Sequence, residues 1–501
     1  MSEVISEFKK EKYDFTVSLS ESQQEKYDEF LSEIKAHLSL SRKQNEEIIS
    51  DFNNALNYLI SNGVSFEEAI NRLDPVQLGG FYVHPSLSWY PLDNAAIVYP
   101  LSLKHGQMPI FRLSVYLKEE VVGEILQMAL NFTIKRFPSF ATTIKNGFFW
   151  NYLDSCKRRF SVEEETSIPC KPLAVGGTRS QSFRVMYYRN RISVEYFHVL
   201  TDGTGGMYFL KTLTAVYLRL LGRKVGNTHG VFNIEKTPDP QETVNEFANS
   251  EVKNGVSGFM GKPAAQMSGK ITDIKPCQVL HFEMDREKLH DKAREHGVTV
   301  TTYILAVMYL AIRHAMEDIN GTVSIQVPVN MRKFNGSRTV RNYSMYFSCD
   351  LDVREITTLE EMLPKIESQL QEKAGWDSMS KMMSTTIKLV QSLKFVPLVV
   401  KKPFVQIAYG FLGDKIFTSF LSNLGVVEVD EGMKDDIEKF DFLLGPSPIC
   451  RTNCTLVTYQ NTTVFSITKI TKDPSFEEAM YDYLVKDGIP FKVYGSEIYA
   501  D

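Results

Sequence analysis

A chain of 501 residues is too long for one ordinary hydrophobic core and predicts two or three domains. Its 43% hydrophobic and 23% charged residues are typical of a soluble globular protein, and a net charge of −5 gives no basic field that would favour nucleic acid. The first residues mix both charges and no run of about 18 apolar residues occurs, so we expect no signal peptide, no membrane-spanning helix and a cytoplasmic protein.

The six cysteines are scattered, and only Cys450 and Cys454 lie close together in sequence. Their spacing, on an expected strand, matches no common zinc-binding pattern. His281, His290 and His296 fall on different expected elements, again without ligand spacing. We therefore expect reduced thiols in or near the core and no metal site.

Residues 1–80 are expected to form a helical N-terminal appendage. Ser18, Ser41 and Ser65 precede segments with apolar residues at helical spacing, and a serine in this place accepts hydrogen bonds from the free amides of the first turn. A glycine pair at residues 79–80 marks the boundary. We favour a packing extension of the main body over a separate binding module.

Residues 81–234 combine strand and helix patterns. Strands are expected at 110–117, after Trp150, and at 182–188 and 192–198, where a tight turn makes the last two a hairpin. An apolar stripe predicts a helix over 119–136. Helices on one side of antiparallel strands place the chain in the α+β class.

The second strand of that hairpin ends in a histidine. Apolar and polar residues alternate along it, the pattern of a half-buried strand. His198 continues the parity of Ile192, Val194 and Tyr196 and should share their face. A dense turn signal follows at residues 201–206, and a helix is expected over 207–221.

Such a histidine suits general base catalysis. A neutral imidazole titrates near neutral pH and can take a proton from an attacking hydroxyl or amine. Asp202, in the turn, can brace the backbone by pairing with a cation from elsewhere. Gly203 is expected to permit the sharp bend, while Gly205 and Gly206 allow close approach to the backbone.

Residues 235–275 are rich in turn formers with few apolar residues between them, the composition of a linker. Residues 276–501 form a second lobe in which strand and helix patterns recur. Strands are expected at 279–284, 324–329, 342–353, 415–421, 449–459 and 463–470, and helices at 286–296, 299–316, 358–372 and 475–485.

The run from His198 to Gly203 resembles the His-x-x-x-Asp-Gly motif of the CoA-dependent acyltransferase superfamily. That group includes chloramphenicol acetyltransferase, plant BAHD acyltransferases, wax ester synthases, alcohol O-acetyltransferases and peptide-synthetase condensation domains. The blocks at 92–96, 136–138, 147–150 and 202–206 are similar, in order, to the bacterial alcohol acetyltransferase-like branch. The resemblance runs from about residue 85 to the C-terminus. It implies two chloramphenicol-acetyltransferase-like lobes joined by a long crossover, each a mixed sheet with flanking helices.

The resemblance also implies roles for residues of the second lobe. Arg332, in the block 328–332, is expected to pair with Asp202 as structural support; the alternative is a solvated surface arginine. Residues 417–425 are similar to the strand and turn that carry a donor for the oxyanion. Thr418, Ser422 and Asn423 are the candidates, the alternative is a plain strand-ending turn, and a one-residue shift in register changes which side chain faces the channel.

The resulting hypothesis is an acyl-CoA-dependent O-acyltransferase, with acetyl-CoA the favoured donor. His198 deprotonates a small hydroxyl acceptor, which attacks the thioester directly, and no bound cofactor is needed. Phe197 departs from the family pattern, because many relatives carry a first histidine there. The alternatives are a condensation-type enzyme that takes its acyl group from a carrier protein, and a non-catalytic binding protein that keeps the fold.

Residues 381–413 contain short apolar stretches broken by lysines, including Lys388, Lys394, Lys401 and Lys402. This pattern fits an amphipathic surface that touches a membrane or a greasy substrate. Core helices with lysines at their edges are the interpretation we favour, so membrane contact is not expected.

Overall fold

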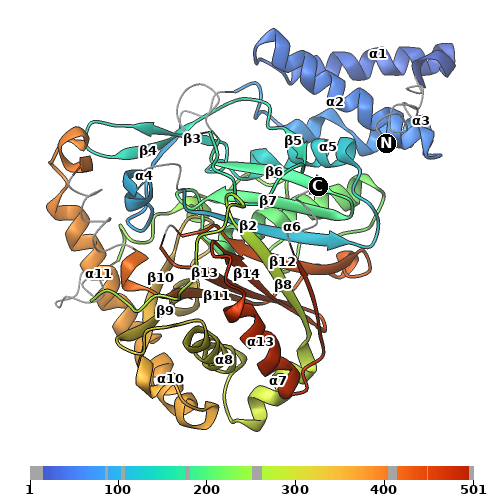
Figure 1. The fold of residues 1–501 in the computed structure, drawn as a ribbon. Helices are drawn as coiled ribbons and strands as arrows, with labels where there is room; N and C mark the ends of the chain where they lie inside the picture. The colour runs from blue at the N-terminus through green and yellow to red at the C-terminus, as the bar shows by residue number, and fades with distance from the viewer. Residues whose placement is uncertain are drawn as a thin grey trace.

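The computed structural model describes residues 15–84, 88–102, 108–174, 181–250, 262–403, 414–447 and 449–495. Two lobes of mixed sheet and helix pack together, and a group of helices from the N-terminus lies against the first lobe at one corner of the molecule (Figure 1). The α+β class and the two-lobed architecture expected from the sequence are confirmed.

The N-terminal helices form because serines cap them and aromatic residues bury one face. Ser20, rather than Ser18, caps the first helix and forms a capping box with Gln23. The ring of Phe52 lies 6.0 Å from that of Phe132 in the first lobe. Asp51, beside it, accepts hydrogen bonds from Arg159 and Asn131. These helices are a packing extension of the lobe: η1 (Phe15–Ser18), α1 (Glu21–Ala36), α2 (Arg42–Ser61), α3 (Phe66–Arg72) and η2 (Pro75–Leu78).

The first lobe is built on a five-stranded sheet in the order β12-β2-β7-β6-β5, in which β12 (Ile437–Leu444) comes from the C-terminal part of the chain. The expected hairpin is present as β6 and β7, which pair antiparallel. A small sheet, β1-β4-β3, lies beside it. The elements of this lobe are β1 (Trp89–Pro91), η3 (Ala96–Val98), α4 (Tyr99–Ser102), β2 (Ile110–Leu117), α5 (Gly123–Thr133), η4 (Ile134–Arg136), β3 (Thr142–Asn146), β4 (Asn151–Ser155), β5 (Val162–Glu164), β6 (Phe183–Tyr188), β7 (Arg191–Phe197) and α6 (Gly203–Leu220).

The two faces of this sheet differ in chemistry because side chains alternate along each strand. One face is apolar and packs against α6. The other carries a buried ion network in which Arg112 donates two hydrogen bonds of 2.6 Å to the Glu165 carboxylate and Arg191 donates a third of 2.8 Å. Burial acts to raise the pKa of Glu165, but Arg112 and Arg191 hold that pKa below its usual value.

The second lobe contains a seven-stranded sheet in the order β10-β9-β11-β13-β14-β8-β15. The helices α7, α8, α10 and α13 gather on one side of it (bottom in Figure 1). Its elements are β8 (Gln278–Asp285), α7 (Arg286–Glu295), α8 (Val300–His314), β9 (Thr322–Asn330), α9 (Arg332–Asn335), β10 (Ser344–Asp352), η6 (Val353–Glu355), α10 (Leu359–Lys373), α11 (Trp376–Ser392), η7 (Asp414–Ile416), β11 (Ser419–Val426), η8 (Glu431–Met433), β13 (Thr452–Tyr459), β14 (Thr462–Lys469), α13 (Ser475–Lys486) and β15 (Phe491–Gly495).

One strand from the C-terminal part of the chain belongs to the first lobe's sheet. β12 (Ile437–Leu444) pairs antiparallel with β2, and Phe440 lies opposite Val115. β12 also holds the second lobe, because Thr468 donates a hydrogen bond of 2.8 Å to the Leu444 carbonyl. The expected division into lobes at 81–234 and 276–501 is therefore crossed by this strand.

The linker expected over 235–275 is packed onto both lobes where the structure describes it; residues 251–261 lie outside the described residues. Glu242, in η5 (Pro240–Thr243), forms an ion pair with Arg136 of the first lobe. Phe247 and Met267 are buried in the core of the second lobe. A few apolar anchors thus hold a segment whose composition is otherwise that of a loop.

Three expected boundaries were wrong. α6 begins at Gly203 rather than at residue 207, because Asp202 acts as its N-cap. The helix expected over 119–136 is α5, which begins at Gly123, four residues later than expected, and is followed by the 3-10 turn η4 up to Arg136. β11 begins at Ser419, so the strand expected over 415–421 lies later in the chain.

The described residues give no support to a transmembrane segment or a metal cluster. No single helix among them is long and apolar enough to span a bilayer. Only α7 and α8 taken together have the length and composition of a membrane span, and they are bent by 83° relative to each other. Among the described residues, no three His, Cys, Asp or Glu side chains are grouped so that they could hold a metal ion. All six cysteines are free, and five of them are buried.

The packing of the N-terminal helices makes a testable prediction. Phe52→Ala should lower the free energy of unfolding by roughly 3–5 kcal/mol, because it leaves a cavity between α2 and α5. All three tryptophans lie outside these helices, so tryptophan fluorescence in urea reports whether the lobes unfold together with them. Val76→Ala, at a side chain that is 61% exposed in the same extension, is the control. A shift in the circular dichroism midpoint without a shift in fluorescence would show that the extension unfolds alone.

Candidate active site

His198 lies directly after β7, on the face that the alternation predicts. Its backbone amide donates a 2.9 Å hydrogen bond to the Pro109 carbonyl beside β2. Its ring is packed between aromatic side chains, with centroids 5.0 Å from Tyr99 and 5.1 Å from Phe111. The backbone and the two rings together fix where the imidazole lies.

Asn342, from the second lobe, determines which imidazole nitrogen carries the proton. Its amide nitrogen donates to the His198 carbonyl at 2.9 Å and to Asp93 Oδ2 at 3.2 Å. These two acceptors orient the amide so that its oxygen faces His198 Nδ1, at 2.9 Å. Nδ1 therefore carries the hydrogen, and Nε2 is the basic nitrogen of the neutral ring.

Behind Asn342 lies a buried acid and a buried arginine. Asp93 is completely buried and also accepts a 2.8 Å hydrogen bond from the Ala96 amide. Burial raises the pKa of Asp93 to about 6, an effect opposed by Arg341, whose guanidinium lies 3.8 Å from the carboxylate. Arg341, Asp93, Asn342 and His198 thus form one chain of polar contacts across both lobes.

The electrostatic setting keeps His198 neutral. Burial lowers its pKa below the usual value, because the charged imidazolium loses hydration; the nearby Asp202 carboxylate acts in the opposite direction. A base with such a pKa is ready to accept a proton at neutral pH.

Asp202 holds the turn after His198 by serving as the N-cap of α6. Its Oδ1 accepts a 3.0 Å hydrogen bond from the Gly205 amide. Its Oδ2 accepts one of 2.8 Å from Arg332 Nη1 and one of 2.7 Å from the Tyr343 amide. The carboxylate is buried, and all of these donors are needed to compensate for its lost hydration.

Arg332 brings the second lobe to this turn. Besides Asp202 it donates to the carbonyl groups of Thr339 at 2.9 Å and Arg341 at 2.6 Å. The arginine therefore fixes the loop 330–343, which carries Asn342, against the start of α6. The pair expected from the sequence is present, and the alternative of a solvated arginine is wrong, because Arg332 is buried.

The glycines of the turn are needed for space rather than for an unusual backbone. Gly203 has no positive φ and is simply the first residue of α6, so the expectation that it permits a sharp bend was wrong. A Cβ on Gly203 would meet only the flexible side chain of Leu424, at 2.7 Å. A Cβ on Gly205 would lie 2.0 Å from the Val340 carbonyl oxygen and 2.2 Å from Thr201 Oγ1. Among the glycines of this turn, Gly205 is thus the one that lets the loop of the second lobe approach α6.

The three expected oxyanion candidates lie in different surroundings. Thr418 is fully buried and donates its hydroxyl proton to the Ala265 carbonyl at 2.7 Å. Asn423 donates to Thr301 at 2.9 Å and accepts from the Gly425 amide at 2.7 Å. Ser422 is half-buried on β11, two residues before Leu424, whose side chain reaches Gly203. Ser422 lies opposite Thr455 of β13, whose hydroxyl donates a hydrogen bond to the Phe442 carbonyl of β12. Ser422 is therefore the candidate on the face of the sheet that meets the first lobe.

Sequence reasoning missed Asn342, Asp93 and Tyr99 as parts of the site. The first lies at the edge of an expected strand and the second within a block noted only for its resemblance, and neither is near His198 in sequence. Phe197 is fully buried and, by the strand alternation, faces away from the imidazole.

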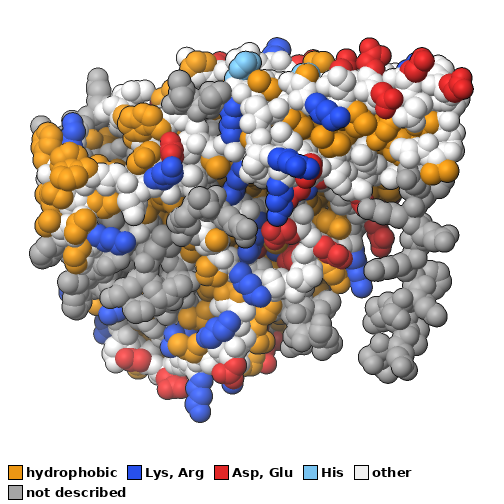
Figure 2. Space-filling model, turned by 90° about the horizontal axis from the view of Figure 1, so that it is seen from above, with side chains coloured by type: hydrophobic (Ala, Val, Ile, Leu, Met, Phe, Trp, Pro, Cys, Tyr) orange, Lys and Arg blue, Asp and Glu red, His pale blue; other side chains and the backbone are white. Residues whose placement is uncertain are grey.

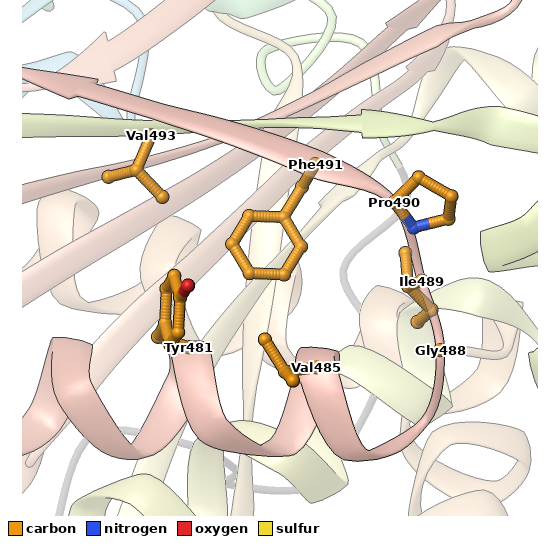
Figure 3. Close-up of a pocket in the computed structure, with 7 residues that line it drawn as sticks. All are labelled: Tyr481, Val485, Gly488, Ile489, Pro490, Phe491 and Val493. Atoms are coloured by element: carbon orange, nitrogen blue, oxygen red, sulfur yellow. The ribbon is translucent and has the colours of Figure 1, made fainter.

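Two surface hollows lie elsewhere. One lies between α13 and β15 and is lined by Tyr481, Val485 and Phe491 among others (Figure 3). The other, of about 440 Å³, lies beside the N-terminal extension and is lined by Gly80, Lys135 and residues near them. Neither contains a residue of the candidate site.

Comparison with models of protein families finds no match, and a search of curated proteins finds no relative in sequence. Solved structures do match. TRI101 from Fusarium sporotrichioides, in complex with coenzyme A and T-2, has a TM-score of 0.57 and 12% identity, covering 81% of this chain and 99% of that chain. TRI3 trichothecene 15-O-acetyltransferase from the same organism has a TM-score of 0.54 and 10% identity, covering 79% and 94%.

A third match is a mutant starter condensation domain of rhizomide synthetase RzmA, in complex with C8-CoA and Leu-SNAC. Its TM-score is 0.52 and its identity 12%, covering 79% of this chain and 93% of that chain. The chain has the two-lobed fold of these proteins. At this low sequence identity the likeness shows the fold alone, and the activity has to be argued from the residues of the site.

The two glycines make a matched pair for testing the lobe contact. Gly205→Ala should lower the free energy of unfolding by about 3 kcal/mol or more, because the new methyl group meets backbone that cannot move aside. Gly203→Ala lies in the same turn of α6 and should change it by about 1 kcal/mol at most, because Leu424 can shift. Urea unfolding followed by circular dichroism measures both. Equal effects would contradict the close approach at Gly205.

Proposed function

We propose that this protein is an acyltransferase that moves an acyl group from a CoA thioester to an acceptor hydroxyl, with His198 as the general base. The observation that carries the proposal is the hydrogen bond from His198 Nδ1 to Asn342 Oδ1. It directs the basic Nε2 away from the second-lobe loop and fixes the tautomer that base catalysis requires.

The reaction proceeds by direct transfer. His198 Nε2 takes the proton from the acceptor hydroxyl as its oxygen attacks the thioester carbonyl. The tetrahedral intermediate collapses, the carbon–sulfur bond breaks, and the proton on Nε2 passes to the departing thiolate. The products are an ester and free CoA, and His198 returns to its neutral form.

Both lobes contribute to this chemistry. The first supplies the base, while Asn342 and Arg332 of the second fix the imidazole and the turn behind it. In this proposal the Ser422 hydroxyl donates a hydrogen bond to the oxyanion as it forms. Asp202 and Arg332 take no part in proton transfer, since each is held in hydrogen bonds that shape the turn.

For the donor we propose acyl-CoA, with an acetyl group favoured and a carrier-bound thioester as the alternative. Two of the structural neighbours were determined with coenzyme A or an acyl-CoA. The partly buried surroundings of His198, with the Tyr99 and Phe111 rings beside it, suit an acceptor with apolar character around its hydroxyl.

His198→Ala should lower kcat/KM by at least about 100-fold while the protein stays folded, the usual scale for removal of a general base. Release of free thiol from acetyl-CoA, with a panel of alcohols as acceptors, measures this. His290→Ala, which removes an exposed histidine of α7, is the matched control and should be fully active. A wild-type protein that releases no thiol with any donor and acceptor would favour the non-catalytic alternative.

The pH dependence tests the role of Asn342. Because the base acts when neutral, kcat/KM should rise with pH through the His198 pKa and level off at neutral pH; burial lowers that pKa, so the midpoint should lie below about 6.5. The bond to Asn342 raises the pKa, so Asn342→Ala should move the rise to still lower pH and reduce the plateau roughly ten- to hundredfold.

A purely structural role for Asn342 would lower the plateau without moving the midpoint. Asn335→Ala, at an amide on the same loop that donates to Tyr343 Oη at 3.2 Å, is the control for loop disturbance. An unchanged midpoint in Asn342→Ala would contradict the proposed tautomer control.

A further inference from the structure

Apolar side chains project from one edge of the molecule with little cover. Phe148, at the tip of the β3–β4 hairpin, is 73% exposed, and Phe395 and Val399, after α11, are 78% and 85% exposed. Leu389 and Val400 are about half exposed. Figure 2 shows hydrophobic side chains gathered at the left edge of the face in view, the side on which Figure 1 places the hairpin and α11. Patches of this kind on a soluble protein mark contact sites.

The two segments form a single surface. The Leu398 amide donates a 2.8 Å hydrogen bond to the Phe148 carbonyl. The rings of Phe149 and Phe395 lie edge to face at 6.3 Å. Behind them the ammonium of Lys401 lies over the Trp150 ring, 2.9 Å from its centroid, and donates to the Leu393 carbonyl. These contacts hold the projecting residues in place. We call the exposed side chains of Phe148, Leu389, Phe395, Val399 and Val400 the Phe148–Val400 surface.

The chain segment that carries most of this surface has charge of one sign. Between Asp377 and Asp414 the chain contains five lysines and no acidic residue, although the whole protein carries a net charge of −5. Lys394 and Lys402 are exposed, and the Lys394 ammonium lies 5.5 Å from the centre of the Phe395 ring. Such a surface is complementary to a negatively charged one.

The sequence analysis favoured core helices with lysines at their edges over residues 381–413. This interpretation is right for the first part of that range and wrong for the part that follows. α11 buries Met379, Met382, Met383 and Ile387 against the second lobe, as a core helix does. From Leu389 onward the apolar residues turn outward instead. Residues 404–413 lie outside the described residues.

We propose that the Phe148–Val400 surface docks the protein onto a membrane that contains anionic lipids. Aromatic and aliphatic side chains enter the boundary between headgroups and acyl chains, while the lysines beside them bind lipid phosphates. The projecting shape favours a bilayer over a protein partner. A protein partner would need a concave complement to these projecting side chains, whereas a bilayer accepts them without one.

The test is co-sedimentation of the full chain with vesicles of phosphatidylcholine alone and of equal parts phosphatidylcholine and phosphatidylglycerol. We expect binding to the mixed vesicles, weakened by added salt, and at most weak binding to phosphatidylcholine. Lys394→Gln with Lys402→Gln should weaken binding roughly tenfold or more. Phe148→Ser with Phe395→Ser should abolish it.

The controls remove similar side chains from elsewhere on the surface. Val17→Ser with Val485→Ser, at positions that are 85% and 52% exposed, and Lys224→Gln with Lys288→Gln, at exposed lysines, should bind like the wild type. Melting temperature and far-ultraviolet circular dichroism show that each variant is folded.

Failure of the wild type to bind mixed vesicles would overturn the proposal. Full binding by the phenylalanine variant would also overturn it. Binding would then rest on the lysines alone, and lysines would be attracted to an acidic protein surface in the same way. The proposed acyltransfer does not enter this test, so the two proposals stand or fall separately.

Discussion

The contact between Arg332 and Asp202 is the constraint on which the site depends. Two buried charges are costly to remove from water, and their mutual attraction compensates only when every remaining hydrogen-bonding group has a partner. Here the carboxylate accepts from Arg332 and from two backbone amides, while the guanidinium also donates to two backbone carbonyl groups. The pair therefore specifies one arrangement of the turn and the loop, and with it the place where Asn342 meets the imidazole.

Local sequence patterns were enough to predict much of the fold around this contact. The β6–β7 hairpin and the face on which His198 lies follow from alternation along a strand, and α8 follows from a cap and an apolar period. The pairing of Arg332 with Asp202 came from resemblance, since nothing local connects residues that are 130 positions apart.

What the sequence did not reveal depends on distant contacts. Asn342 orients His198 from 144 residues away, and an asparagine at a strand edge has many ordinary uses. The start of β11 was misplaced by four residues. Which of Thr418, Ser422 and Asn423 faces the channel could not be decided from the sequence, because a one-residue shift in register moves every side chain to the other face. The exposure of residues after Leu389 was equally hidden, because an apolar stretch has the same pattern whether it faces the core or the solvent.

The strand that crosses between lobes has a consequence for how the protein is made. β2 is complete once about a quarter of the chain has been synthesised, but its partner in β12 lies about 325 residues later. Until then one edge of the first sheet presents unpaired backbone groups, the kind of edge that recruits other strands. Closing so long a loop is slow, so the sheet of the first lobe stays incomplete until most of the chain has been synthesised. Its dependence on chaperones should therefore be set by the length of the chain between the two strands.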